Sequence, residues 1–157
     1  MDCLLTREFA AKPGSAMARI FWDTNLFIYL FEHNAEWSAR VMAFRQRMVA
    51  RRDELLTSYL TLGEALTKPR ETGNSVLEKS YLNFFVNGPI ELIAFEVEAA
   101  KRYAEIRSRE RIRPADAIQL ACAAAARTDL FVTNYNRLSG MVVTGITFIT
   151  GIERIPY

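Results

Sequence analysis

The strongest restriction on the fold of this chain is a regular alternation of short apolar runs with longer stretches of helical periodicity. The short runs have the length of buried strands and are bounded by turn-forming residues. Strands that alternate with helices favour a parallel sheet with helices packed on its faces. We therefore predict an α/β fold, a three-layer sandwich whose central, mainly parallel sheet has four or five strands. The predicted strands cover residues 20–22, 55–57, 90–95, 130–133 and 146–149.

Between these runs, apolar residues recur at helical spacing, as in the amphipathic stretch over residues 37–48. The helix after the second strand is predicted to end at Lys68 and Pro69, because proline disrupts a helix interior. A later helix, opened by Pro114, is apolar on nearly all sides and should lie buried. The predicted helices cover residues 26–31, 37–48, 60–67, 77–85, 97–111 and 114–127.

One globular domain accounts for most of the chain. Its 157 residues are 50% hydrophobic and 24% charged, a composition typical of a single domain with its own core. Residues 1–16 show no clear period, end soon after Pro13 and Gly14, and precede a second methionine, Met17. We interpret residues 1–16 as a poorly ordered N-terminal extension and residues 17–157 as the folded domain.

The scarcity of histidine and cysteine limits the chemistry. His33 is the only histidine, which leaves little material for a histidine metal cluster or a Ser-His-Asp relay. Cys3 and Cys122 stand far apart, as in reduced intracellular proteins. No stretch approaches the ~20 apolar residues of a membrane span, and the first residues lack the basic start of a secretory signal. We predict a cytoplasmic protein, not bound to a membrane, whose reactive groups are carboxylates.

Three carboxylates stand where an ordinary core would not place them. Asp23 directly follows a predicted buried strand, Glu64 lies inside an apolar helix, and Asp116 lies in the first turn of the most apolar helix. Each also has a structural explanation. Asp23 can cap the next helix, and Glu64 can complete a capping box that starts at Thr61. Asp116 suits the positive end of its helix.

A parallel sheet offers these three acids a common location. Ligands collect at the carboxyl ends of the strands in such a sheet, and the helices that carry Glu64 and Asp116 can adjoin that edge. At a separation of about 4 Å, each pair of carboxylates repels by roughly 4 kcal/mol at an effective dielectric of about 20. Such a cluster takes up protons or holds a cation. Ligand sets made only of oxygen favour Mg²⁺ or Mn²⁺.

Four segments occur in a specific order along the chain: residues 20–25 (Ile-Phe-Trp-Asp-Thr-Asn), Glu64 in its helix, residues 114–121 (Pro-Ala-Asp-Ala-Ile-Gln-Leu-Ala) and residues 129–134 (Asp-Leu-Phe-Val-Thr-Asn). In this order they resemble the PIN-domain nucleases, and among those the VapC-type toxins of bacterial toxin–antitoxin pairs. The resemblance covers about residues 17–153. It implies a PIN-like three-layer sandwich and a metal-dependent endoribonuclease.

Residue roles follow from this resemblance by position. Asp23, Glu64 and Asp116 match the catalytic acids; Asp23 and Asp116 would bind Mg²⁺ or Mn²⁺, and Glu64 would orient the attacking water. The family's fourth acid is replaced by Tyr135, so we expect one metal ion to bind in the absence of RNA. Asp129 precedes its strand and should face away from the site. Secondary site candidates are Thr24, Asn25, Thr133, Asn134 and Asn136.

Basic residues flank the two helices that carry the acids and are candidates for salt-dependent contacts with RNA phosphate. The alternative is a solvated helix face on which Glu105 and Glu110 pair with neighbouring arginines. The candidates for RNA contacts are Lys68, Arg70, Arg111 and Arg113.

Two other functions remain open on the sequence. A phosphatase with an aspartate nucleophile also places an aspartate after its first strand, but it needs a second one where Asn25 stands. A PIN fold with weakened catalysis that binds RNA or protein is the other alternative, which Tyr135 keeps open. For the toxin, the resemblance implies RNA as substrate, a homodimer, and a small cognate antitoxin that inserts a segment near the acids.

Overall fold

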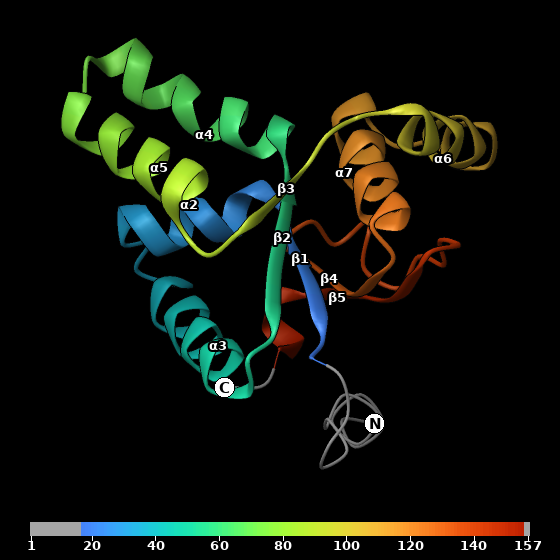
Figure 1. The fold of residues 1–157 in the computed structure, drawn as a ribbon, viewed down its shortest axis with the longest axis horizontal. Coiled ribbons are helices and arrows are strands. Elements are labelled where there is room, and N and C mark those ends of the chain that lie inside the picture. The colour runs from blue at the N-terminus through green and yellow to red at the C-terminus, as the bar shows by residue number, and fades with distance from the viewer. Residues whose placement is uncertain (1–16, 156–157) are drawn as a thin grey trace.

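The sheet is parallel throughout. The computed structural model describes residues 17–155, so the predicted extension over residues 1–16 lies outside the described residues. Within this range, five strands form one sheet in the order β3-β2-β1-β4-β5, and all neighbours are parallel (Figure 1). The predicted mainly parallel sheet is therefore confirmed. The strands are β1 (Arg19–Trp22), β2 (Glu54–Ser58), β3 (Glu91–Ile93), β4 (Thr128–Thr133) and β5 (Ile146–Gly151).

Helices cover both faces of this sheet. Helices α2 to α5 lie on one side of it and α6 and α7 on the other, which confirms the predicted three-layer sandwich (Figure 1). None of the helices within residues 17–155 has both the length and the apolar character needed to cross a bilayer. The helices are α2 (Thr24–Glu32), α3 (Ser38–Arg51), α4 (Tyr59–Thr72), α5 (Ser75–Asn87), α6 (Val97–Arg109), α7 (Pro114–Ala125) and the short 3-10 helix η1 (Ile152–Arg154).

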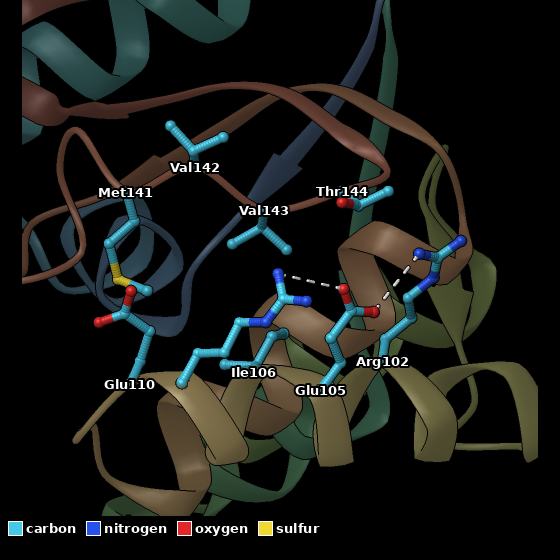
Figure 2. Close-up of a pocket in the computed structure, with 9 residues that line it drawn as sticks. Arg102, Glu105, Ile106, Glu110, Met141, Val142, Val143 and Thr144 are labelled. Atoms are coloured by element: carbon cyan, nitrogen blue, oxygen red, sulfur yellow. Dashed lines mark ion pairs between the residues drawn. The ribbon is translucent and has the colours of Figure 1, made fainter.

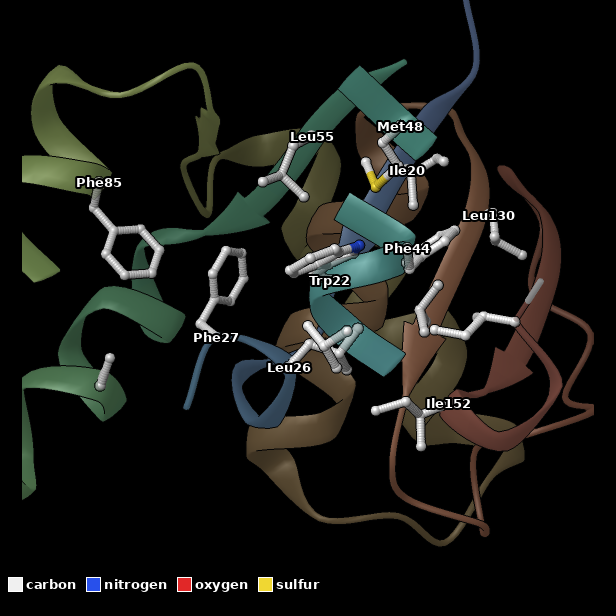
Figure 3. Packing of buried hydrophobic residues seen from close by; sticks show 14 of the residues in the cluster. Ile20, Trp22, Leu26, Phe27, Phe44, Met48, Leu55, Phe85, Leu130 and Ile152 are labelled. Atoms are coloured by element: carbon white, nitrogen blue, oxygen red, sulfur yellow. The ribbon is translucent and has the colours of Figure 1, made fainter. Parts of the chain in front are cut away.

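Alternate residues of β1 pack against the two helical layers, because successive side chains of a strand point to opposite faces. Ile20 and Trp22 belong to the core formed with α2 and α3, and Phe21 belongs to the core formed with α7. The Trp22 indole stacks on Phe44 with ring centroids 5.9 Å apart, and it meets Phe27 at 5.3 Å (Figure 3). These buried contacts fix the carboxyl end of β1.

Local signals set where the helices begin. Asp23 caps α2 and Pro114 opens α7. Ser58 caps α4, since its hydroxyl accepts a hydrogen bond from the Thr61 amide at 3.4 Å. Thr61 therefore lies inside the helix, and the predicted alternative of a capping box from Thr61 to Glu64 is wrong. The position of Glu64 in the first half of α4 does not follow from helix capping.

Helix α4 does not end at Lys68 and Pro69 as predicted. It continues through the buried Pro69 to Thr72 and ends at Gly73, whose φ of 67° suits glycine. Pro69 removes one backbone hydrogen bond of the helix, and its side chain is buried in the packed protein. Other boundaries shift by a few residues: α7 ends at residue 125, two residues before the predicted end, and β3 is limited to residues 91–93.

The strand order reverses at β1. The chain places β2 and β3 on one side of β1, and β4 and β5 on the other. In a parallel sheet this reversal opens a crevice at the carboxyl ends of the two strands on either side of the switch, here β1 and β4. Asp23 follows β1 and Thr133 ends β4, so both residues lie at this crevice.

Candidate active site

A pocket of about 330 Å³ opens at the crevice. It is lined by the three carboxylates singled out in the sequence, each from a different segment: Asp23 after β1, Glu64 in α4 and Asp116 in α7. Two of the secondary candidates, Thr24 and Asn25, line it as well. Acids that are far apart in the sequence therefore share one pocket.

Asp23 lies at the floor of this pocket and is 7% exposed. Its Oδ1 accepts a hydrogen bond from the Thr24 amide and its Oδ2 accepts one from Thr133 Oγ1, both at 2.8 Å. Burial first, and then the charges of Asp116 and Glu64, raise the pKa of Asp23 to about 6 against the lowering effect of these hydrogen bonds. A nearby cation would therefore stabilise the ionised form of Asp23.

The protein without metal is expected to gain stability as the pH falls from about 6 to about 4. The pKa of Asp23 is about 6 in the folded state against 3.8 for an unperturbed carboxyl, so the folded state takes up the proton first. Above pH 6 the buried charge destabilises the fold, and below pH 4 this destabilisation is gone. The free energy of unfolding should rise by about 3 kcal/mol over this window from Asp23 alone.

Urea unfolding in EDTA across this pH range measures the effect. The comparison is with Asp23→Asn, which has no carboxyl to titrate, so that the difference between the two proteins isolates Asp23. Parallel stability profiles for wild type and Asp23→Asn would contradict the expectation.

Glu64 is held by a hydrogen-bond network beneath the pocket. Its Oε1 accepts a hydrogen bond from Thr24 Oγ1 at 2.8 Å. The Gln119 amide donates to Thr24 Oγ1 at 3.1 Å and to Thr61 Oγ1 at 2.7 Å, and its Oε1 accepts from Ser58 Oγ at 2.5 Å. Gln119 is 1% exposed. The network ties α2, α4 and α7 together at the point where Glu64 enters the pocket.

Asp116 is paired with an arginine of the same chain. Arg113 Nε lies 2.9 Å from Asp116 Oδ2, and Arg113 Nη2 lies 3.3 Å from Oδ1. The Arg113 guanidinium also lies over the ring of Tyr135, 4.4 Å from its centroid. The pocket is therefore less negative than its three carboxylates alone imply.

The carboxylates share the pocket without forming a joint ligand cage. Across residues 17–155, no three carboxylate, histidine or cysteine side chains are arranged to hold a metal ion together. Two of the three acids have partners within the protein instead: Thr24 donates to Glu64, and Arg113 pairs with Asp116. The donor chemistry still fits a hard divalent cation, because Asp23 and Asp116 offer buried carboxylate oxygens.

The remaining secondary candidates differ in position. Thr133 lies beneath the pocket and donates to Asp23. Asn134 does not line the pocket; its amide donates to the Tyr29 hydroxyl at 2.6 Å. Asn136 is exposed and lies outside the pocket lining. Of the neutral side chains in this loop, only Thr133 contacts a pocket carboxylate.

Of the four basic candidates, only Arg113 lines the pocket. Lys68 Nζ lies 3.9 Å from Glu32 Oε1, and Arg70 Nε lies 2.8 Å from Glu78 Oε1. Arg111 is exposed and outside the pocket lining. Lys68 and Arg70 therefore pair with acids on the helical layer of α2 and α5.

Asp129 is the second residue of β4, so the prediction that it precedes its strand is wrong, and it lies at the amino ends of the strands. Its Oδ2 accepts a hydrogen bond from the Arg19 amide, at the amino end of β1, at 2.7 Å. It faces away from the pocket at the carboxyl ends of the strands, which makes it a suitable control position for the acids of the pocket.

A second, smaller pocket of about 50 Å³ lies between α6 and the loop before β5 (Figure 2). Glu105 contacts both Arg102 and Arg109 there, at 3.9 and 3.6 Å. The pairing of Glu105 with neighbouring arginines, predicted as the alternative for the basic residues, is confirmed at this place. None of the predicted site residues lines this pocket.

Comparison with known families assigns the fold. The sequence over residues 20–141 matches the family model of the PIN domain. The chain belongs to the PIN domain family. The matched range contains all three pocket carboxylates, as well as Arg113 and Tyr135.

The fold of this PIN domain is similar to solved structures of toxin–antitoxin proteins. One is VapBC2 from Rickettsia felis bound to a DNA fragment from its promoter (17% identity, 84% of this chain and 97% of that chain covered, TM-score 0.66). Others are a toxin–antitoxin complex from Klebsiella pneumoniae (20%, 81% and 94%, 0.61) and VapBC-5 from Mycobacterium tuberculosis (19%, 86% and 99%, 0.54). At these identities the likeness is one of fold. A comparison with curated proteins found no match.

Two residues of this PIN domain have contacts that sequence reasoning did not assign. Gln119 is central to the buried network, and Tyr135 supports Arg113. The signal for Gln119 is visible in retrospect, because it is a large polar side chain within the apolar helix α7. Tyr135 was noted only as the replacement of an acid, and its contact with Arg113 joins two loops that are distant in the sequence.

Proposed function

We propose that this PIN domain is a metal-dependent endoribonuclease and acts as the toxin of a toxin–antitoxin pair. The observation that carries the proposal is the buried Asp23, whose pKa is raised to about 6 in a pocket shared with Glu64 and Asp116. Membership of the PIN family and a fold similar to those of VapBC proteins support this function.

Asp23 and Asp116 are the residues that would hold Mg²⁺ or Mn²⁺. When bound, such an ion supplies positive charge to the phosphodiester and acidifies a water molecule for attack on phosphorus. Thr133 keeps the Asp23 carboxylate in place through its hydrogen bond at 2.8 Å. Thr24, itself held by Gln119, binds Glu64 Oε1, and the other carboxylate oxygen of Glu64 would orient the attacking water. Positioned carboxylates of this kind are suited to proton transfer from water.

A cleavage assay on structured RNA tests the function. The wild type should cut RNA with Mg²⁺ or Mn²⁺ and stop in EDTA. Asp116→Asn should lower the rate by about 10²-fold or more, because it removes one of two charged ligands. Asp129→Asn makes the same change at the amino ends of the strands, away from the pocket, and should retain activity. Cleavage that persists in EDTA would contradict the proposal. An equal loss of cleavage rate in Asp116→Asn and Asp129→Asn would contradict it as well.

One observation favours a second function, that of a binding module with weakened catalysis. Arg113 already neutralises Asp116, which lowers the charge available to a metal ion. RNA binding that persists in EDTA, together with no cleavage at any Mn²⁺ concentration, would support this module against the nuclease.

The proposed toxin has two protein partners: a second copy of itself and a small antitoxin that covers the acidic pocket. An antitoxin that presents a basic side chain would compete with Arg113 for the same carboxylate. Light scattering after co-expression with the product of the adjacent gene measures both stoichiometries. Suppression of RNA cleavage by that product would support the antitoxin role.

A further inference from the structure

Arg113 is a cation of this chain that lies inside its own acidic pocket. It stands directly before α7, three residues from Asp116. Its side chain is 61% exposed, whereas the Asp116 side chain is 8% exposed. The guanidinium therefore reaches from the exposed rim of the pocket to a buried carboxylate.

The two contacts of Arg113 use different parts of the guanidinium. Its N–H edge points to Asp116, with contacts of 2.9 and 3.3 Å. Its central carbon, Cζ, lies over the Tyr135 ring, 4.4 Å from the ring centroid. Stacking on an aromatic ring leaves the N–H edge available for an anion. A phosphate group therefore competes with Asp116 for Arg113, whereas Tyr135 does not compete.

Tyr135 is positioned by the same residue that holds Asp23. The Tyr135 amide donates to Thr133 Oγ1 at 3.0 Å, and that hydroxyl donates to Asp23 Oδ2 at 2.8 Å. The backbone that carries the aromatic ring is thus tied to the floor of the pocket. An arginine that stays on this ring remains above the pocket after it has released Asp116.

We propose that Arg113 is an exchangeable cation of the site: it binds Asp116 in the free protein and moves to a phosphodiester oxygen of RNA when a divalent ion takes Asp116. Tyr135 is the positioning residue that keeps the guanidinium at the pocket during this exchange. The inference rests on the proposed nuclease function and names a substrate contact of that site. An exposed ion pair is readily exchanged, and arginine binds phosphate in the bidentate manner that it uses with carboxylate.

The exchange predicts opposite effects of one substitution on two ligands. Arg113→Gln frees Asp116, so Mn²⁺ affinity measured by calorimetry without RNA should rise about fivefold or more. The same variant lacks the phosphate contact, so its affinity for a short fluorescein-labelled single-stranded RNA, measured with saturating Ca²⁺ in place of Mn²⁺, should fall about tenfold. Arg109→Gln is the matched control, because Arg109 pairs with Glu105 on α6 and should leave both constants unchanged.

Two substitutions of Tyr135, one to leucine and one to phenylalanine, test its role. Tyr135→Leu should weaken RNA binding and raise KM more than it lowers kcat, and Tyr135→Phe should restore both because it keeps the ring. A purely structural role would not distinguish phenylalanine from leucine in this way. Equal RNA affinities for the two variants would overturn the role of Tyr135.

The outcomes separate this inference from the nuclease proposal. If the wild type cleaves RNA and Arg113→Gln changes neither the Mn²⁺ nor the RNA affinity, the exchange is overturned and the nuclease stands. If Arg113→Gln shifts both constants in opposite directions but the wild type does not cleave RNA, the exchange is supported and the nuclease proposal fails.

Discussion

Asp23→Asn is expected to lower metal-dependent RNA cleavage about 10³-fold while it stabilises the metal-free fold. The loss of activity follows because Asp23 is a buried member of the proposed metal-ligand pair and its charge cannot be replaced by an amide. Several kcal/mol of transition-state stabilisation depend on a correctly positioned cation, and each 1.4 kcal/mol corresponds to about a tenfold change in rate.

The same substitution is expected to stabilise the metal-free protein, because the buried Asp23 carboxylate destabilises the fold when no cation is bound beside it. Its pKa near 6 means that the ionised form is disfavoured by the fold at neutral pH. Asparagine removes that charge, and its side-chain oxygen can still accept from the Thr24 amide. The free energy of unfolding in EDTA at pH 7 should rise by about 2 kcal/mol.

Cleavage rates and urea unfolding of the same preparations measure both effects. Asp129→Asn is the control, since it should change neither property. An Asp23→Asn protein that is less stable than wild type in EDTA would contradict the account of the buried charge. One that cleaves RNA at the wild-type rate would contradict the proposed role of Asp23 in the site.

Gln119→Leu is expected to destabilise the protein by about 3 kcal/mol, because it leaves buried hydroxyl groups without their partner. Ser58 Oγ loses its acceptor, and Thr24 and Thr61 lose a donor. Leucine fills a similar volume, so the loss reports hydrogen bonding more than packing. Cleavage should also fall about tenfold, since Thr24, which holds Glu64, loses the Gln119 contact.

Urea unfolding, with the midpoint and slope compared between variants, measures this loss. Cys122→Ala is the matched control on the same helix: Cys122 is 1% exposed and packs in the apolar core beside α7. Removing one sulfur atom there should cost about 1 kcal/mol. A Gln119→Leu protein no less stable than Cys122→Ala would show that the network does not stabilise the fold.

The fold was largely predictable because the sequence patterns that indicate its strands and helices are local. The apolar run that ends at Trp22 and the turn residues after it define β1 without knowledge of its neighbours. The parallel order then follows from the alternation of strands and helices. Pro69 shows the limit of such rules, since its burial against the rest of the protein lets α4 continue where a local rule ends it.

The candidate site was predictable only in part. Asp23, Glu64 and Asp116 were identified as residues that a parallel sheet can bring to one edge, and all three line the pocket. Their partners were not identified, because hydrogen bonds such as that from Thr133 to Asp23 join residues far apart in the sequence. The three-residue spacing of Arg113 and Asp116 was a local signal for their ion pair, but it is equally compatible with an arginine that faces solvent.

The order of the strands also affects when the protein acquires its pocket during synthesis. Strand β1 is made early, yet Ile20 pairs with Leu130 and Trp22 with Val132, near the other end of the chain. Chains fold as they emerge from the ribosome, starting with their N-terminal part. A nascent chain cannot hold Asp23 against Thr133 until β4 has emerged. The acidic pocket therefore takes shape only after β4 has been made, although Asp23 itself is made much earlier.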